Sequence, residues 1–183
     1  MMFENENFKT KKICNASKWA VTGFMGAGKS WFIEKLRFLG KNTEDLDHII
    51  ETSQGKTISK LISEGSVDAF RNIEDQCLED FLNDEQDSFF LALGGGALND
   101  KNFQNLRSHG VHLIFLDTPF EVCYQRIKNC SQRPLAQLSK SELEKLYHQR
   151  IRVYQKADIT LKLKSDLNPV ELKEILLNQG IKF

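Results

Sequence analysis

Residues 23–30 read Gly-Phe-Met-Gly-Ala-Gly-Lys-Ser, a complete match to a pattern whose residue types and spacing suit phosphate binding. The glycines let the backbone curl, so that successive N–H groups face one anion at the start of a helix. Lys29 adds a positive charge for the β- and γ-phosphates, and the Ser30 hydroxyl is an oxygen ligand of the kind that Mg²⁺ prefers. This stretch, the phosphate loop, predicts that the chain binds a nucleoside triphosphate.

The segments beside the phosphate loop are those that such a loop needs. Residues 19–22 are apolar and favour a strand, and in residues 31–39 apolar side chains recur at helical spacing. Gly40 is placed to end that helix. The alternative is a glycine-rich turn that happens to precede Lys-Ser, but it does not account for the full motif between a strand and a helix.

Two carboxylates, Asp45 and Asp47, follow in an acidic segment that predicts a short strand at residues 42–47. Side chains two residues apart in a strand point the same way, so both are expected beside the phosphate loop. One carboxylate could approach Mg²⁺ through water, and the other could accept hydrogen bonds from a hydroxyl. The alternative is a solvated acidic loop, which the neighbouring phosphate loop makes the weaker reading.

Three consecutive glycines, Gly94, Gly95 and Gly96, interrupt an apolar run that predicts a buried strand at residues 88–93. Glycines cost backbone entropy and add nothing to packing, so three together suit a place where a ligand approaches the backbone closely. We call these three residues the glycine turn, and we interpret it as part of a second binding pocket.

The remaining candidate site residues are arginines. Arg71 has Glu74 three residues later on a predicted helix, which could hold its guanidinium in place, although a plain surface ion pair is the usual alternative. Arg133 lies in a polar segment with a proline, residues 129–138, of the sort that forms a mobile lid. Arg150 and Arg152 lie on the predicted helix that follows.

Strands and helices alternate along the chain, which predicts an α/β fold with a parallel sheet and ligands at the carboxyl ends of its strands. We expect one domain over residues 18–183, preceded by a flexible extension at residues 1–17. The predicted strands cover residues 19–22, 42–47, 88–93, 111–116 and 158–163. The predicted helices begin near Trp31, His48, Thr57, Ser66, Asn99, Pro119, Ser139 and Asn168.

Composition narrows the class of protein. The 183 residues carry 25 basic and 25 acidic side chains, so the bulk charge does not suggest a nucleic-acid partner. The 4 cysteines show neither zinc-ligand spacing nor a disulfide framework, and they indicate reduced thiols in the cytoplasm. No apolar run is long enough to cross a membrane, and the first residues lack the apolar core of a signal peptide.

The order of these motifs resembles the shikimate kinase family. The resemblance covers nearly all of residues 19–169, and it rests on G-F-M-G-A-G-K-S, D-L-D-H-I-I-E, F-R-N-I-E, G-G-G, R-P-L and H-Q-R-I-R-V-Y in this order. It implies a three-layer α/β/α sandwich with a five-stranded parallel sheet, similar to nucleoside monophosphate kinases, with a lid at residues 129–138 and a substrate-binding subdomain at about residues 45–81. It also implies transfer of the γ-phosphoryl group of ATP to the 3-hydroxyl of shikimate, with Mg²⁺, by a monomeric enzyme.

The resemblance also assigns roles to single residues. It implies that Lys29, Asp47 and Arg133 serve catalysis, that Ser30 binds Mg²⁺, and that Asp45 reaches the metal through water. It implies that Asp47 binds the hydroxyl groups of shikimate. It implies that Arg71, Arg150 and the glycine turn bind the carboxylate of shikimate. The residues expected to bind ATP are Gly26, Ala27, Gly28, Lys29, Ser30, Trp31, Arg126, Arg133 and Pro169.

Two departures leave questions open. Trp31 stands where the family usually has a small residue, and Ile151-Arg152-Val153 replaces the usual Asn-Pro-Leu after Arg150, so either Arg150 or Arg152 could complete the carboxylate site. The rival functions are a gluconate-type kinase of the same fold and a nucleotide-binding module without turnover. A module of that kind would have no use for the second pocket.

Overall fold

The computed structural model describes residues 17–84, 86–128, 138–164 and 166–182. The expected N-terminal extension therefore lies outside the described residues except for Ser17, and the expected lid lies outside them except for Leu138.

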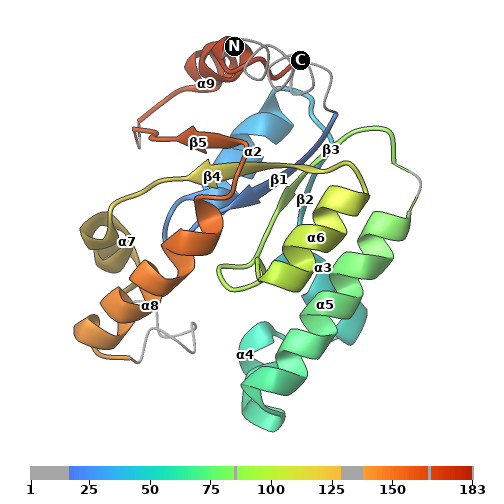
Figure 1. Ribbon diagram of the computed structural model, residues 1–183, viewed down its shortest axis with the longest axis vertical. Coiled ribbons are helices and arrows are strands. Elements are labelled where there is room, and N and C mark those ends of the chain that lie inside the picture. The colour runs from blue at the N-terminus through green and yellow to red at the C-terminus, as the bar shows by residue number, and fades with distance from the viewer. Residues whose placement is uncertain (1–16, 85, 129–137, 165, 183) are drawn as a thin grey trace, which may run out of the picture.

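Five parallel strands form one sheet, as the resemblance implies, and their order in the sheet is β2-β3-β1-β4-β5 (Figure 1). The strands β1, β3 and β4 contain almost only buried apolar residues, because helices cover both faces of a parallel sheet. The strands are β1 (Lys18–Thr22), β2 (Thr43–Asp45), β3 (Phe89–Ala92), β4 (His112–Leu116) and β5 (Ile159–Leu161).

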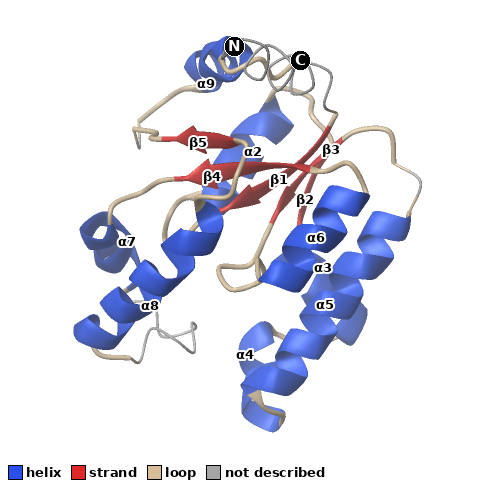
Figure 2. Cartoon of the chain, in the orientation of Figure 1, coloured by secondary structure: helices blue, strands red, loops and turns tan. Residues whose placement is uncertain are grey.

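Helices lie on both sides of the sheet, with α2 behind it and α6 and α8 in front of it in the view of Figure 2. The fold is thus the predicted three-layer α/β/α sandwich. The helices are α2 (Lys29–Phe38), α3 (Leu46–Gln54), α4 (Ile58–Glu64), α5 (Val67–Asn83), α6 (Asp100–Ser108), α7 (Phe120–Ile127), α8 (Lys140–Tyr154) and α9 (Pro169–Asn178).

Side chains cap most helices at the positions that the sequence predicts. Ser66 and Asn99 accept hydrogen bonds from backbone N–H groups at the starts of α5 and α6. Ser139 and Asn168 each form a reciprocal capping box at the starts of α8 and α9. Pro119 occupies the N-cap position of α7, one residue earlier than the first turn predicted for it.

The predicted strand at residues 42–47 is wrong at its last two residues, which belong to α3. β2 ends at Asp45, whose side chain accepts a hydrogen bond of 3.0 Å from the N–H of Asp47 and thereby caps α3. Asp47 lies in the first turn of that helix, so the two carboxylates do not share one face of a strand. A capping aspartate ends the strand earlier than the charge pattern predicts, because aspartate is among the best N-cap residues.

The core holds two of the four cysteines, Cys77 and Cys123, as buried free thiols. Aromatic side chains fill much of the rest, for example Phe24 edge-on against Tyr147 at 5.2 Å between ring centroids. Along the described part of the chain, no helix is both long enough and apolar enough to span a bilayer.

The carboxylate of Asp158 connects the start of β5 to β4, at the end of the sheet opposite the glycine turn. Asp158 Oδ2 accepts hydrogen bonds from Arg107 Nη1 at 2.6 Å and from the N–H of Leu113 at 2.8 Å, and His112 Nδ1 lies 3.5 Å away. Burial alone would raise the pKa of Asp158, but these neighbours outweigh it and hold that pKa well below its usual range.

We predict that Asp158→Asn lowers the free energy of unfolding at pH 7 by about 1–3 kcal/mol, because charge-assisted hydrogen bonds are lost. A depressed pKa stabilises the fold fully only above the unfolded value of about 4, so the difference from wild type should shrink as the pH falls below that value. Urea unfolding of wild type and variant at several pH values measures this difference in the free energy of unfolding.

The matched control is Asp100→Asn, which removes an exposed carboxylate paired with Lys156 at 2.6 Å. Its cost should stay below about 1 kcal/mol, because exposed ion pairs contribute little. Equal losses for both variants, or a loss for Asp158→Asn that does not change with pH, would contradict this account of the cluster.

Candidate active site

The phosphate loop connects β1 to α2, and its shape requires glycine. Gly26 has a φ of +79°, in the region that favours glycine, and a Cβ there would lie 2.7 Å from the carbonyl oxygen of Cys123 in α7. Lys29 Nζ donates hydrogen bonds to the carbonyls of Gly23 at 2.8 Å and Phe24 at 3.1 Å. The loop is therefore packed against α7, with the ammonium group held over its own backbone.

The N-terminus of α2 differs from those of most other helices. Side chains cap α3, α4, α5, α6, α8 and α9, whereas no side chain caps α2, which follows Gly28 in a left-handed conformation. The only other described helix without such a cap is α7, which follows a proline. The first N–H groups of α2 can therefore donate to an anion at the positive end of the helix dipole.

A pocket of about 250 Å³ opens beside the phosphate loop, on the side of β4 and β5. Two side chains of its wall also hold the loop, since Arg126 Nη1 donates to the carbonyl of Gly26 at 2.9 Å and Thr118 Oγ1 donates to that of Ala27 at 3.0 Å. The pocket suits the base and sugar of a nucleotide whose phosphates lie at α2. Its lining residues are Ala27, Gly28, Trp31, Leu116, Thr118, Arg126, Leu163 and Lys164.

The predicted nucleotide residues do not all line this pocket. Trp31 lies in its wall, with Lys35 Nζ 5.7 Å from the centre of its ring. Pro169 lies at the first turn of α9 and is not part of the wall. Arg133 lies outside the described residues.

Ser30 and Asp45 bring two oxygen atoms together at the start of α2. Ser30 Oγ lies 3.5 Å from Asp45 Oδ2, across the gap between α2 and the end of β2. Hydroxyl and carboxylate oxygens are the ligands that Mg²⁺ prefers, and Mg²⁺ usually takes only one or two of them from the protein. Among the described residues, no group of three or more His, Cys, Asp or Glu side chains could hold a metal ion.

Two carboxylates lie against the glycine turn. A Cβ on Gly94 would be 2.8 Å from Asp47 Oδ1 and 2.8 Å from Glu74 Oε1, so only glycine fits between them. Glu74 is 1% exposed, and burial raises the pKa of its carboxyl although the neighbouring Arg71 opposes the shift. Asp47 is exposed, as a carboxylate that meets a ligand's hydroxyl groups must be.

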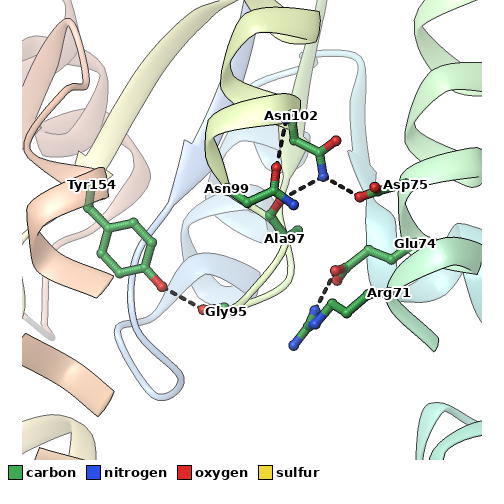
Figure 3. A network of polar contacts seen from close by, with 8 residues as sticks. All are labelled: Arg71, Glu74, Asp75, Gly95, Ala97, Asn99, Asn102 and Tyr154. Atoms are coloured by element: carbon green, nitrogen blue, oxygen red, sulfur yellow. Dashed lines mark hydrogen bonds and ion pairs between the residues drawn. The ribbon is translucent and has the colours of Figure 1, made fainter. Parts of the chain in front are cut away.

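Two guanidinium groups meet at the other end of the same turn. A Cβ on Gly96 would clash with the guanidinium of Arg71 and lie 2.9 Å from Arg150 Nη2. Arg71 forms an ion pair with Glu74, as predicted (Figure 3), but this partner is buried rather than at the surface. Burial lowers the pKa of Arg150, and the charge of Arg71 lowers it further. Two cations this close favour an anion between them.

Arg150, and not Arg152, reaches this turn. Arg150 lies over the ring of Phe24, 5.8 Å from its centre, and faces Gly95 and Gly96. Arg152 is exposed on α8. Arg150 and Arg152 face different ways because residues two apart on a helix lie on nearly opposite sides. A Cβ on Gly95 would lie 3.3 Å from the backbone nitrogen of Met25, so the glycine turn and the phosphate loop are in contact.

Sequence reasoning missed several residues of the site. It treated Glu74 only as the partner of Arg71, and it gave no role to Thr118, Leu163, Lys164 or Tyr154. Thr118 and Leu163 each follow the end of a strand, β4 or β5, and a search of the carboxyl ends of all predicted strands could have found them. Tyr154 donates a hydrogen bond to the carbonyl of Gly95, a contact for which the sequence holds no signal.

Three comparisons with known proteins all point to the same family. The model of the shikimate kinase family matches residues 25–179. The shikimate kinase of Persephonella marina is 33% identical over 143 residues, which cover 77% of this chain and 85% of that protein. The structure of shikimate kinase from Acinetobacter baumannii in complex with shikimate has a TM-score of 0.80 at 28% identity, over 92% of this chain and 96% of that one.

A gluconokinase from Sinorhizobium meliloti is also similar, with a TM-score of 0.56 over 90% of this chain and 91% of that one. At 15% identity, that likeness shows only a shared fold. The family model, by contrast, covers most of the chain and includes the phosphate loop from Met25 onward, both arginines at the glycine turn, and Asp47. The chain therefore belongs to the shikimate kinase family.

Proposed function

We propose that this chain transfers the γ-phosphoryl group of ATP to the 3-hydroxyl of shikimate, a step toward chorismate and the aromatic amino acids. The observation that carries the proposal is the meeting of Arg71 and Arg150 at a glycine turn that contacts the phosphate loop. An acceptor with a carboxylate at one end and hydroxyl groups at the other fits between these arginines and Asp47. Shikimate is such a molecule.

The protein's own groups then act as follows. Lys29 and the N–H groups of α2 hold the phosphates and offset the charge that develops on the transferring group. Asp47 accepts a hydrogen bond from the reacting hydroxyl and turns its oxygen toward ATP. Arg71 and Arg150 hold the carboxylate and so fix the distance between that hydroxyl and the phosphate. Arg133, outside the described residues, is predicted to stabilise the same developing charge.

We extend the proposal to Mg²⁺, with Ser30 as its ligand and Asp45 as its partner through water, because their oxygens lie close together at the phosphate loop. When bound, Mg²⁺ neutralises negative charge on the phosphates of ATP. The contact of Pro169 with ATP, the lid, the substrate-binding subdomain, the monomeric state and the cytoplasmic location stay predictions that accompany this function.

Release of ADP, followed with a coupled assay, tests the function. We expect release with ATP and shikimate, and only background release with ATP alone or with gluconate in place of shikimate. Release that depends on gluconate would assign the chain to the rival class of kinase. ATP binding without release for either acceptor would indicate a module without turnover.

The first prediction from this function concerns phosphoryl transfer. Lys29→Ala should leave the fold intact and lower turnover by at least ~100-fold, because a charge beside the transferring group is lost. The control is Lys60→Ala, at an exposed lysine on α4 whose ion pair with Glu64 spans 3.6 Å. Steady-state kinetics and circular dichroism measure both variants, and near-normal turnover of folded Lys29→Ala would refute the role.

The second prediction concerns the acceptor carboxylate. Arg71→Lys keeps the charge but loses the two-pronged guanidinium, so KM for shikimate should rise about tenfold while KM for ATP hardly changes. Arg152→Lys, on the exposed side of α8, should leave both values unchanged.

An acceptor analogue without the carboxylate sharpens this prediction. It should be almost insensitive to Arg71→Lys, since the contact that the variant weakens is already absent. If the analogue and shikimate lose the same factor, Arg71 serves structure only, and the carboxylate binds elsewhere.

The third prediction separates binding from chemistry. Asp47→Asn keeps the size of the side chain but removes the charge that faces the acceptor hydroxyl, so turnover should fall by about 100-fold as shikimate binding weakens. Asp68→Asn, at an exposed aspartate in the first turn of α5, is the control. A change in KM without any change in kcat would show that Asp47 binds the acceptor and takes no part in the transfer.

A further inference from the structure

The glycine turn has no side chains of its own, so other residues must hold it in place. Two buried polar side chains do so from opposite flanks, Tyr154 of α8 and Asn102 of α6 (Figure 3). Each is 1% exposed, whereas Asp47 is exposed. Their hydrogen bonds end on backbone carbonyls of the turn and of the residue after it.

Tyr154 holds the middle of the turn. Its hydroxyl donates to the carbonyl of Gly95, and its ring packs on Phe115 of β4 at 5.5 Å between centroids. Burial raises the pKa of Tyr154 to about 12, so the hydroxyl stays a donor at neutral pH. Arg150 lies one helical turn earlier on α8, and its guanidinium lies beside the same hydroxyl. One side chain therefore fixes both the turn and an arginine that meets it.

Asn102 connects the residue that follows the turn to α5. Its Nδ2 donates to the carbonyl of Ala97 at 2.8 Å and to Asp75 Oδ1 at 2.7 Å. Asp75 follows Glu74 directly and lies one turn beyond Arg71 on the same helix. The amide of Asn102 therefore connects α5, which carries Arg71, to the chain beside the glycine turn that Arg71 meets.

We propose that Tyr154 and Asn102 are positioning residues for the acceptor: they fix the glycine turn relative to Arg150 and Arg71, and so set the affinity for the acceptor's carboxylate. The inference rests on the proposed function. It adds residues that contact no substrate and act through the backbone of the turn and through the two arginines.

Tyr154→Phe tests the proposal, because it keeps the ring in place and removes only the hydroxyl. We expect KM for shikimate and its calorimetric Kd to rise about fivefold, the effect of one hydrogen bond, while KM for ATP stays within about twofold.

A matched control lies two turns earlier on the same helix. Tyr147 is also buried and also donates to a backbone carbonyl, that of Thr118 at 3.1 Å, but on the nucleotide side of the phosphate loop. Tyr147→Phe should lower the melting temperature about as much as Tyr154→Phe and leave KM for shikimate unchanged. Similar changes in shikimate KM for both variants would show a general loss of stability and overturn the proposal.

The second flank is tested with Asn102→Ala against Asn105→Ala on the same helix. Only Asn102→Ala should raise KM and Kd for shikimate, measured at a temperature where both variants are folded. Unchanged shikimate affinity in Tyr154→Phe overturns the inference even if Asn102→Ala weakens binding. Wild-type protein runs in the same assay: if it releases no ADP with shikimate, the proposed function fails, whereas active wild type with unaffected variants refutes the positioning role alone.

Discussion

The rest of the site depends on the close approach of charged side chains to a backbone without side chains. Two carboxylates lie 2.8 Å from where a Cβ on Gly94 would be, two guanidiniums lie within 2.9 Å of where a Cβ on Gly96 would be, and Gly95 lies against the phosphate loop. Any other residue would push these groups apart. The glycine turn thus lets four charges from α3, α5 and α8 surround one small volume, at the edge of the loop that holds the phosphates.

In the proposed function, the order of the strands separates the two substrates. β1, which leads into the phosphate loop, lies at the centre of the sheet, with β3 and β2 on one side and β4 and β5 on the other. Asp47 and the glycine turn follow β2 and β3, and the pocket proposed for the nucleotide lies beside residues that follow β4 and β5. Because parallel strands place all their carboxyl ends at one edge, Asp47, the glycine turn and the phosphate loop lie at the same edge of the sheet. Buried apolar strands provide the rigid base for this arrangement.

Local sequence predicted the fold closely, since caps, glycines and apolar periodicity are local signals and the starts at Ser66, Asn99, Ser139 and Asn168 agree with them. The resemblance to the shikimate kinase family, rather than these local signals, brought Asp47, Arg71 and either Arg150 or Arg152 to the glycine turn. Local sequence did not predict the features that depend on tertiary contacts. The N-cap role of Asp45 shortened a predicted strand, and the burial of Glu74 depends on how α5 packs against α3 and the glycine turn. The choice of Arg150 over Arg152 depends on which side of α8 faces the turn.

The central claim is that the acceptor's carboxylate lies between Arg71 and Arg150 at Gly96. A crystal structure of the protein with shikimate and ADP tests it most directly. The account predicts carboxylate oxygens about 3 Å from both guanidiniums and a ring hydroxyl within hydrogen-bond distance of Asp47. A shikimate carboxylate bound by Arg152, or placed away from the glycine turn, would contradict it.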